Sequence, residues 1–160
     1  MSRSAGGGVA ASMALRVHDA GGVQPAAQAL FCPMLDDRTA AQLELDALEH
    51  RIWNNRSNRA GWTWYLGQPV GQSQVPAYAV PARRTVLAGL PPAWIAVGDI
   101  DLFYGEDRAY AERLSQAGVP CEFYPVSRAP HGFETFAPEA TLSRDLFTDY
   151  YRFLRQVLKL

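Results

Sequence analysis

Short apolar segments that alternate with helical segments constrain the fold of this chain more than any other feature. The apolar segments are 27–32, 93–98 and 120–126, and the helical segments around them are 9–17, 106–117 and 142–158. Short apolar runs bounded by turn residues are typical of buried parallel strands. Parallel strands need crossover connections, which helices supply with right-handed geometry. We therefore predict an α/β fold with about three parallel strands flanked by helices.

The middle of the chain is less regular. Residues 40–52 carry apolar side chains on one side and acids on the other, which predicts a helix. Residues 53–67 hold three of the four tryptophans, and we interpret this segment as a lateral helix or lid whose aromatic residues pack rather than bind substrate. Residues 68–92 contain five prolines, so we expect a loop that runs over the surface.

Length and charge narrow the class of protein. The chain has 160 residues, 48% of them hydrophobic, and a formal net charge of −1. This length suits a single domain over residues 1–160, which would bury roughly 70% of its unfolded surface. A near-neutral chain lacks the basic footprint of a nucleic-acid-binding protein. We expect a small neutral molecule as the partner.

The cysteines and the apolar runs bear on metal binding and location. Cys32 and Cys121 stand in no metal-ligand spacing, so we predict no zinc site. Two lone thiols suit a reducing compartment, although the sequence also leaves a disulfide between them open. No charged and apolar leader opens the chain, and no apolar run approaches the roughly 18 residues of a membrane span. We expect a soluble, cytoplasmic protein.

Small residues at the start of the chain predict a tight turn. Ser4 is followed by Ala5 and the glycines from Gly6 to Gly8, directly before the helical segment 9–17. Asp101 and His131 each come just after a predicted strand. A serine on a strand-to-helix turn, followed in the chain by an acid and then a histidine, is the order found in α/β-hydrolases.

The chain resembles the bacterial α/β-hydrolase fold-3 family, the carboxylesterases similar to hormone-sensitive lipase. The most specific matching segments are Ser-Ala-Gly-Gly-Gly (4–8), Pro-Met-Leu-Asp-Asp-Arg (33–38), Ser-Asn-Arg-Ala-Gly-Trp (57–62), Gly-Leu-Pro-Pro (89–92), Val-Gly-Asp-Ile-Asp-Leu-Phe (97–103) and His-Gly-Phe (131–133). The resemblance implies hydrolysis of short or medium acyl esters without cofactor or metal. It implies Ser4 as nucleophile with Gly6 as the small residue after it, His131 as general base, Asp101 as its acid partner and the Ala5 N–H as an oxyanion donor.

The sequence departs from the family pattern in three places. Ser2 stands where the family has Gly, and residues 126–128 read Val-Ser-Arg where the family usually has Tyr-Pro-Gly. The family also implies a cap, five strands and a His-Gly-Gly-Gly oxyanion loop before the nucleophile, and no such run precedes Ser4. Losing a donor of this kind costs a factor of about 100 to 1000 in rate. We expect a weakly active or inactive chain in which Ser4 is the worst-placed group.

The missing strands also predict an unpaired edge. Without a neighbour, segment 27–32 would expose an apolar strand edge that invites a second chain. We therefore expect either a homo-oligomer or pairing with a complementing hydrolase half.

Alternatives remain at the site and for the function. Asp99 competes with Asp101 for the role of acid, and Asp36, Asp37 and Glu134 are interpreted as structural partners or helix caps. A non-catalytic fragment or interaction module is the main alternative function. Gly-x-Gly-x-x-Ala over residues 6–11 also fits a dinucleotide-binding turn, but no strand is predicted before it and no acid ends the next strand. A phosphate-binding loop fits less well, because no Lys-Ser/Thr follows the glycines.

Overall fold

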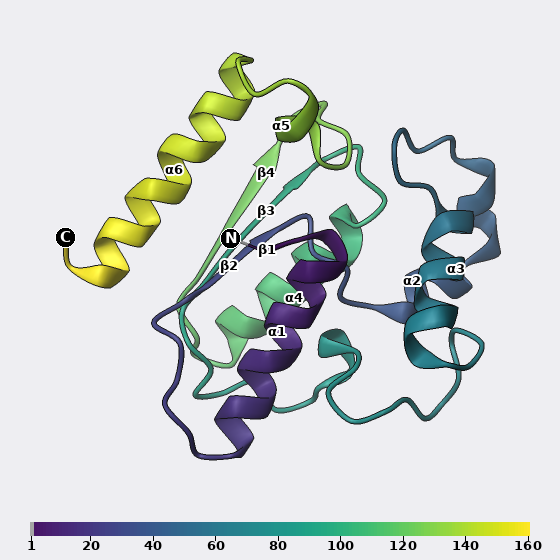
Figure 1. Cartoon of the computed structure of the whole chain (residues 1–160), viewed down its shortest axis with the longest axis horizontal. Coiled ribbons are helices and arrows are strands. Elements are labelled where there is room, and N and C mark those ends of the chain that lie inside the picture. Colours follow the sequence, from purple (N-terminus) through teal and green to yellow (C-terminus); the bar gives the residue numbers. More distant parts are fainter. Residues whose placement is uncertain (1) are drawn as a thin grey trace.

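The computed structural model describes residues 2–160, and its centre is a parallel β-sheet (Figure 1). The strands lie in the order β1-β2-β3-β4. Their bounds are β1 Ser2–Arg3, β2 Gln28–Phe31, β3 Ala93–Gly98 and β4 Cys121–Val126. The predicted α/β class is confirmed, and the three predicted strands are β2, β3 and β4. The two-residue β1 is a fourth strand that was not predicted.

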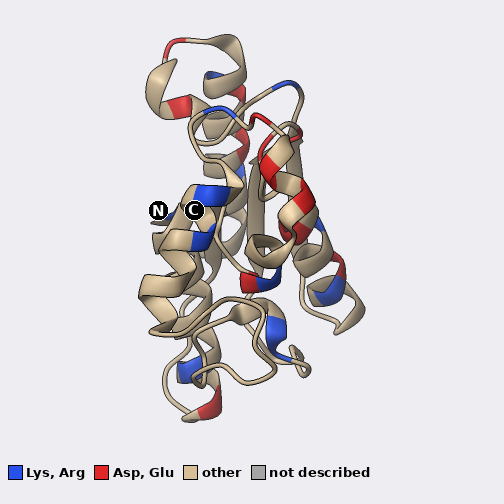
Figure 2. Cartoon of the chain, turned by 90° about the vertical axis from the view of Figure 1, so that its right-hand side faces the viewer, with Lys and Arg blue, Asp and Glu red and all other residues tan. Residues whose placement is uncertain are grey.

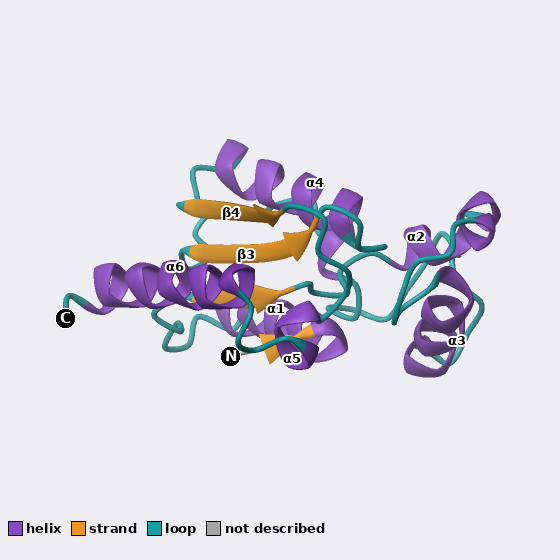
Figure 3. Cartoon of the chain, turned by 90° about the horizontal axis from the view of Figure 1, so that it is seen from above, coloured by secondary structure: helices purple, strands orange, loops and turns teal. Residues whose placement is uncertain are grey.

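Helices cover both faces of the sheet. Their bounds are α1 Ser4–Asp19, α2 Asp37–Ala41, α3 Asn55–Leu66, α4 Tyr104–Gln116, α5 Phe133–Phe136 and α6 Thr141–Leu158, with short 3₁₀ helices η1 Leu43–Ala47 and η2 Pro81–Arg83. In Figures 1 and 3, α1 and α4 lie on one face and α6 on the other, while α2 and α3 form a lateral lobe. The predicted helices at 9–17, 106–117 and 142–158 correspond to α1, α4 and α6.

The two faces bury different side chains because residues alternate along each strand. Leu30 and Ile95 pack with Leu15 of α1 and Leu114 of α4. On the opposite face, buried aromatic and aliphatic residues of the strands pack against α6; they are Phe31, Trp94, Ala96 and Val126, with Leu146, Tyr150 and Phe153 from the helix. All six residues of β3 are buried, as expected for a central strand covered on both faces.

The expected apolar edge at residues 27–32 is wrong in its second half. Ser2 pairs with Leu30 and Arg3 with Phe31, so β1 covers the end of β2 that leads to the site. Two polar residues carry no periodicity, and for that reason no strand was expected here. The residues that pair with the end of β2 on this side are the two that directly precede Ser4.

The predicted helix at 40–52 is wrong, because the structure divides this segment. α2 ends at Ala41, and Gln42 has extended angles (φ −78°, ψ 94°) before η1 begins. The Asn55 side chain donates to the Gln42 carbonyl at 2.9 Å. In a continued helix, this carbonyl would instead accept from a backbone N–H four residues later. At the other end of α2, Asp36 accepts a hydrogen bond from the Arg38 N–H at 3.0 Å, which confirms its expected role as a cap.

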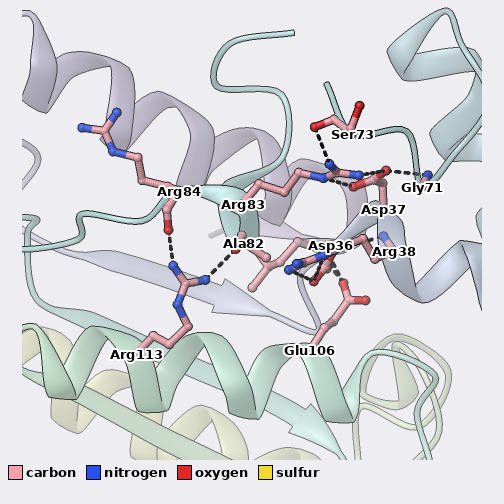
Figure 4. Close-up of polar contacts among 11 residues, drawn as sticks. Asp36, Asp37, Arg38, Gly71, Ser73, Ala82, Arg83, Arg84, Glu106 and Arg113 are labelled. Atoms are coloured by element: carbon pink, nitrogen blue, oxygen red, sulfur yellow. Dashed lines mark hydrogen bonds and ion pairs between the residues drawn. The ribbon is translucent and has the colours of Figure 1, made fainter. Parts of the chain in front are cut away.

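The segment 68–92 is a loop, as expected, but it is tied down and partly buried. The Arg83 guanidinium binds both carboxylate oxygens of Asp37 at 2.7 and 2.8 Å, and the Gly71 N–H donates to the same carboxylate at 2.9 Å (Figure 4). Leu87 and Leu90 of the loop enter the core beside α1 and α4. Asp37 is therefore a structural anchor, which agrees with the structural role expected for it.

Candidate functional site

Ser4 lies on a sharp turn between β1 and α1. Its φ of +51° is in the left-handed region, which is strained for a residue with a side chain. Its carbonyl accepts a hydrogen bond from the Met34 N–H at 3.0 Å, which joins the turn to the chain after β2. This geometry is that of a nucleophile elbow, where a serine hydroxyl projects from a strand-to-helix turn.

Two glycines let α1 approach the chain that follows β2. A Cβ on Gly8 would lie 2.1 Å from the Met34 carbonyl oxygen, and one on Gly7 would lie 2.8 Å from the Pro33 Cβ. Any side chain at Gly8 would push α1 away from the chain that follows β2. Gly6 was expected to be the necessary small residue, but a Cβ added to it would meet no atom within 4 Å, so close packing depends on its two neighbours instead.

Ser4, His131 and Asp101 form a continuous hydrogen-bonded chain. His131 Nε2 lies 3.0 Å from Ser4 Oγ, and His131 Nδ1 lies 2.9 Å from Asp101 Oδ2. Asp101 follows β3 and His131 follows β4, so the carboxyl ends of adjacent strands bring them together. The expected contact between Asp101 and His131 is confirmed. The expectation that Ser4 would be badly placed is wrong, because β1 and the packing of α1 hold its turn against β2.

Backbone contacts fix the two loops that carry the acid and the histidine. Asp101 Oδ1 accepts a hydrogen bond from the Phe103 N–H at 3.0 Å, which orients the carboxylate. A Cβ on Gly98 would lie 1.7 Å from the Ala129 carbonyl oxygen, so only glycine lets the end of β3 meet the histidine loop. The His131 ring contacts Phe103 edge-on, with centroids 5.3 Å apart.

Asp99, the alternative candidate for the acid, binds the backbone of the turn before His131 instead. Its Oδ1 accepts a hydrogen bond from the Arg128 N–H at 2.5 Å. Arg128 has a φ of +58°, so an arginine occupies a left-handed position where the family usually has glycine. The structure thus brings Asp101 to His131 and uses Asp99 to hold the turn that precedes it.

The first turn of α1 offers N–H groups beside Ser4. The first N–H groups of a helix, here including that of Ala5, have no partner within the helix. The residue before the helix, Arg3, makes no side-chain capping bond to them. Ala5 is exposed. The positive end of the helix therefore lies at the turn that carries Ser4.

An apolar cavity of about 130 Å³ adjoins the elbow. The lining residues come from α1, the chain after β2 and the lateral lobe; they are Ala5, Gly8, Val9, Met34, Trp53, Gly61, Trp62, Tyr65 and Ala79. Trp53 also lies beside His131, with ring centroids 6.2 Å apart. Trp53 and Trp62 thus both pack and line a cavity, whereas the side chain of Trp64 is exposed.

Cys32 is a buried thiol close to Asp101 and His131. Its Sγ, one oxygen of Asp101 and one nitrogen of His131 lie within 4.8 Å of one another. Burial, reinforced by the charge of Asp101, raises the pKa of the Cys32 thiol far above its usual range, so the thiol stays protonated and is a poor metal ligand. Cys121 is also a free thiol, and the two cysteines form no disulfide.

Two buried acids, Glu106 and Asp107, lie at the start of α4, and no sequence pattern marked them as candidates. Glu106 Oε1 accepts hydrogen bonds from the Leu35 and Asp36 N–H groups at 2.7 and 3.1 Å (Figure 4). Burial raises the pKa of Glu106 to about 8. Asp107 is fully buried with neither carboxylate oxygen hydrogen-bonded; burial and then the charge of Glu106 raise its pKa well above the usual range.

Comparison with known proteins decides the family. A family model described as "alpha/beta hydrolase fold" matches residues 2–135. The chain belongs to the α/β-hydrolase fold-3 family. It is 36% identical to Esterase LipI of Mycobacterium tuberculosis over 86% of this chain and 44% of that protein. It is 31% identical to Carboxylesterase NlhH of the same species, over 84% of this chain and 42% of the relative. The chain therefore spans less than half the length of these curated relatives.

Solved structures of the hydrolase family agree over nearly all of this chain. A bacterial heroin esterase superposes with a TM-score of 0.90 at 33% identity, covering 98% of this chain and 50% of that one. Esterase LipW from Mycobacterium marinum gives 0.85 at 37% identity, covering 98% and 48%. An esterase of the bacterial hormone-sensitive lipase family gives 0.82 at 26% identity, covering 96% and 51%. The chain thus corresponds to about half of each solved relative.

Two further features bear on partners. Among residues 2–160, no helix is both long and apolar enough to cross a lipid bilayer. In Figure 2, ribbon segments with Lys and Arg are scattered among segments with Asp and Glu.

The dinucleotide-binding alternative loses its support. The Cβ positions of Gly7 and Gly8 lie against Pro33 and Met34, so these glycines serve the packing of α1 on the chain after β2. β2 ends at Phe31 and leads to Cys32, not to the acid that would bind a ribose.

Proposed function

We propose that this protein is a carboxylic ester hydrolase in which Ser4 is the nucleophile, His131 the general base and Asp101 the acid that orients His131. The observation that carries the proposal is the unbroken chain of contacts, 3.0 Å from Ser4 to His131 and 2.9 Å from His131 to Asp101. Both distances are within the range for a nucleophile, base and orienting group that act together. The names of the curated relatives support the same class of reaction.

The reaction follows from these contacts. In the tautomer with a proton on Nδ1, His131 donates to Asp101 and accepts from the Ser4 hydroxyl. Ser4 Oγ attacks the ester carbonyl carbon while His131 Nε2 takes the hydroxyl proton. The carbonyl π electrons move to the oxygen, and the Ala5 N–H at the positive end of α1 stabilises that oxyanion. When the carbonyl re-forms, the bond to the alkoxy group breaks, and that group leaves as an alcohol with the proton from His131.

A water molecule completes the cycle. His131 takes a proton from the water while the water oxygen attacks the acyl carbon of the Ser4 ester. A second oxyanion forms on the acyl oxygen, and the Ala5 N–H stabilises it as before. Breaking the bond to Ser4 Oγ releases the carboxylic acid, and His131 returns the proton to Ser4. Asp101 stays ionised and stabilises the imidazolium at each step. No cofactor or metal takes part.

The apolar cavity supports short or medium acyl esters as substrates. It adjoins Ala5, the residue next to the nucleophile, and its lining is aliphatic and aromatic. Such a surface favours the hydrocarbon part of an ester over charged groups. We propose a small, uncharged ester handled in the cytoplasm, with no nucleic-acid partner.

The proposal is tested with p-nitrophenyl butyrate turnover and with covalent labelling by a fluorophosphonate. We expect Ser4→Ala to abolish both. Ser12→Ala is the matched control, because Ser12 lies on the same helix, is nearly buried and has no hydrogen-bond partner for its hydroxyl. Equal labelling of the Ser4→Ala variant and the unchanged chain would refute the nucleophile. Absence of labelling in the unchanged chain would favour the alternative of an inactive fragment or interaction module.

A further inference from the structure

An ion pair joins the residue before the proposed nucleophile to the loop of the proposed base. Arg3 Nε lies 2.7 Å from Glu134 Oε1. Arg3 directly precedes Ser4 on β1, and Glu134 lies in α5, three residues after His131. The N–H does not point along the contact, so the two groups attract as charges without a hydrogen bond between these atoms. The pair is thus a second link between the two turns that the 3.0 Å contact of Ser4 and His131 already joins.

Glu134 is a buried carboxylate with Arg3 beside it. The Glu134 side chain is 3% exposed, and it lines a small buried cavity together with Cys32 and Asp101. Among the described residues, Arg3 is the cation at ion-pair distance from this carboxylate. A buried carboxylate without its partner is strongly unfavourable, because little else compensates for its lost hydration. Without the ion pair, α5 loses its link to β1, and the loop that carries His131 can shift relative to Ser4.

The other supports of the two turns are unequal. Asp101 and a backbone contact at Gly98 hold His131 against the interior of the sheet. Ser4 follows a strand with two paired residues at the sheet edge. Arg3 lies on that short strand, so its charge ties the less supported turn to the better supported one.

We propose that the Arg3–Glu134 ion pair is a positioning device that sets the reach between the Ser4 hydroxyl and the His131 imidazole. Neither residue touches the reacting atoms; both act through the turns that carry them. The catalytic consequence rests on the proposed esterase function, whereas the geometric one does not. A misplacement of about 1 Å between reacting groups can cost on the order of 100-fold in rate.

The experiment compares Arg3→Gln, Arg3→Lys and Glu134→Gln with the unchanged chain. Arg84→Gln is the matched control. Arg84 pairs with Asp19 at 2.8 Å, and its side chain is 34% exposed against 32% for Arg3. Asp19 is the last residue of α1, so this ion pair lies at the opposite end of the helix from Ser4. Fluorophosphonate labelling is measured over a range of probe concentrations, which separates the maximal labelling rate from apparent probe affinity. The ¹⁵N shift of His131 Nε2 is measured in each variant, with Ser4→Ala as the reference that lacks the hydroxyl contact.

We expect Arg3→Gln and Glu134→Gln to lower the maximal labelling rate by about 10- to 100-fold with probe affinity unchanged. Their Nε2 shifts should move toward that of Ser4→Ala, while Arg3→Lys should stay within about threefold of the unchanged chain because it keeps the charge. Arg84→Gln should change neither readout. The proposal is overturned if Arg3→Gln and Glu134→Gln leave both readouts unaltered, or if Arg3→Lys loses as much as Arg3→Gln.

Failure of the esterase function would be visible separately. If the unchanged chain does not label, the function fails, and the Nε2 shifts alone decide whether the ion pair positions the two groups. If Arg3→Gln does not fold, the comparison of Arg3→Lys and Glu134→Gln still decides the matter, since a shift unaltered in Glu134→Gln overturns the proposal.

Discussion

Replacing Glu106 by Gln should change how the stability of the protein depends on pH. In the folded chain, burial raises the pKa of Glu106 to about 8, compared with an ordinary value of 4.5 in the unfolded chain. Between these values the folded state holds a proton that the unfolded state has lost. Folding must therefore take up a proton, and the free energy of unfolding falls as pH rises. The stabilisation is complete below about pH 4.5 and is lost as pH passes the folded pKa.

The size of the effect follows from proton linkage. One proton taken up on folding changes the free energy of unfolding by about 1.4 kcal/mol per pH unit. Over the pH interval between the unfolded and folded pKa values of Glu106, the total is of the order of several kcal/mol. A glutamine keeps the carbonyl oxygen that accepts from the Leu35 and Asp36 N–H groups and cannot ionise. We expect Glu106→Gln to resemble the unchanged chain near pH 5 and to be more stable by a few kcal/mol near pH 8.5.

Urea unfolding followed by far-ultraviolet circular dichroism at pH 5, 6, 7 and 8.5 measures this difference. Asp107 titrates in the same direction because its pKa is also raised, so Asp107→Asn is measured beside it and should remove a further part of the slope. Asp46 and Asp149 have lowered pKa values and therefore act below this pH window. A Glu106→Gln variant that loses stability with pH as steeply as the unchanged chain would refute the reasoning.

Three other predictions concern the packing of α1, backbone strain at Arg128 and the choice of acid. Gly8→Ala should destabilise the fold by about 2–3 kcal/mol or more, because the added Cβ would lie 2.1 Å from a backbone oxygen. Gly6→Ala, where the added Cβ has open space, should stabilise α1 by about 0.5–1 kcal/mol. Urea unfolding measures both, and equal effects would contradict the packing argument. Arg128→Gly should stabilise by up to about 1 kcal/mol, since it relieves a φ of +58°, and a lower thermal midpoint would count against that strain. Asp101→Asn should lower ester turnover by about 10³- to 10⁴-fold while Asp99→Asn costs far less, and similar losses would reopen the choice of acid.

Segments with strong local patterns were predicted well from the sequence. β3, β4 and α6 match their expected segments closely, because each is long enough to show continuous apolar character or helical periodicity. β1 has two residues and no such signal. The segment 40–52 shows helical periodicity but is divided by a hydrogen bond from Asn55, which lies outside it. A contact of this kind is fixed by tertiary packing, which local patterns do not report.

The site was predictable in its members but not in its supports. Ser4, Asp101 and His131 are recognised by order and by neighbouring residues, and the structure brings all three together. The contacts of Arg3 with Glu134, and of Glu106 with the chain after β2, join residues that are far apart in sequence. Charged residues in these positions resemble ordinary helix ends or surface groups until the fold buries them.

The unequal strands beneath the site have a consequence for how the protein would lose activity. β3 and β4 are joined through six residue pairs, whereas β1 meets β2 through two. Local opening is easiest where few backbone hydrogen bonds must break. The turn that presents Ser4 would therefore detach while Asp101 and His131 still face one another on an intact sheet. In mild denaturant the protein would pass through a state that is folded by most optical measures and yet has its acid and base assembled around an absent nucleophile.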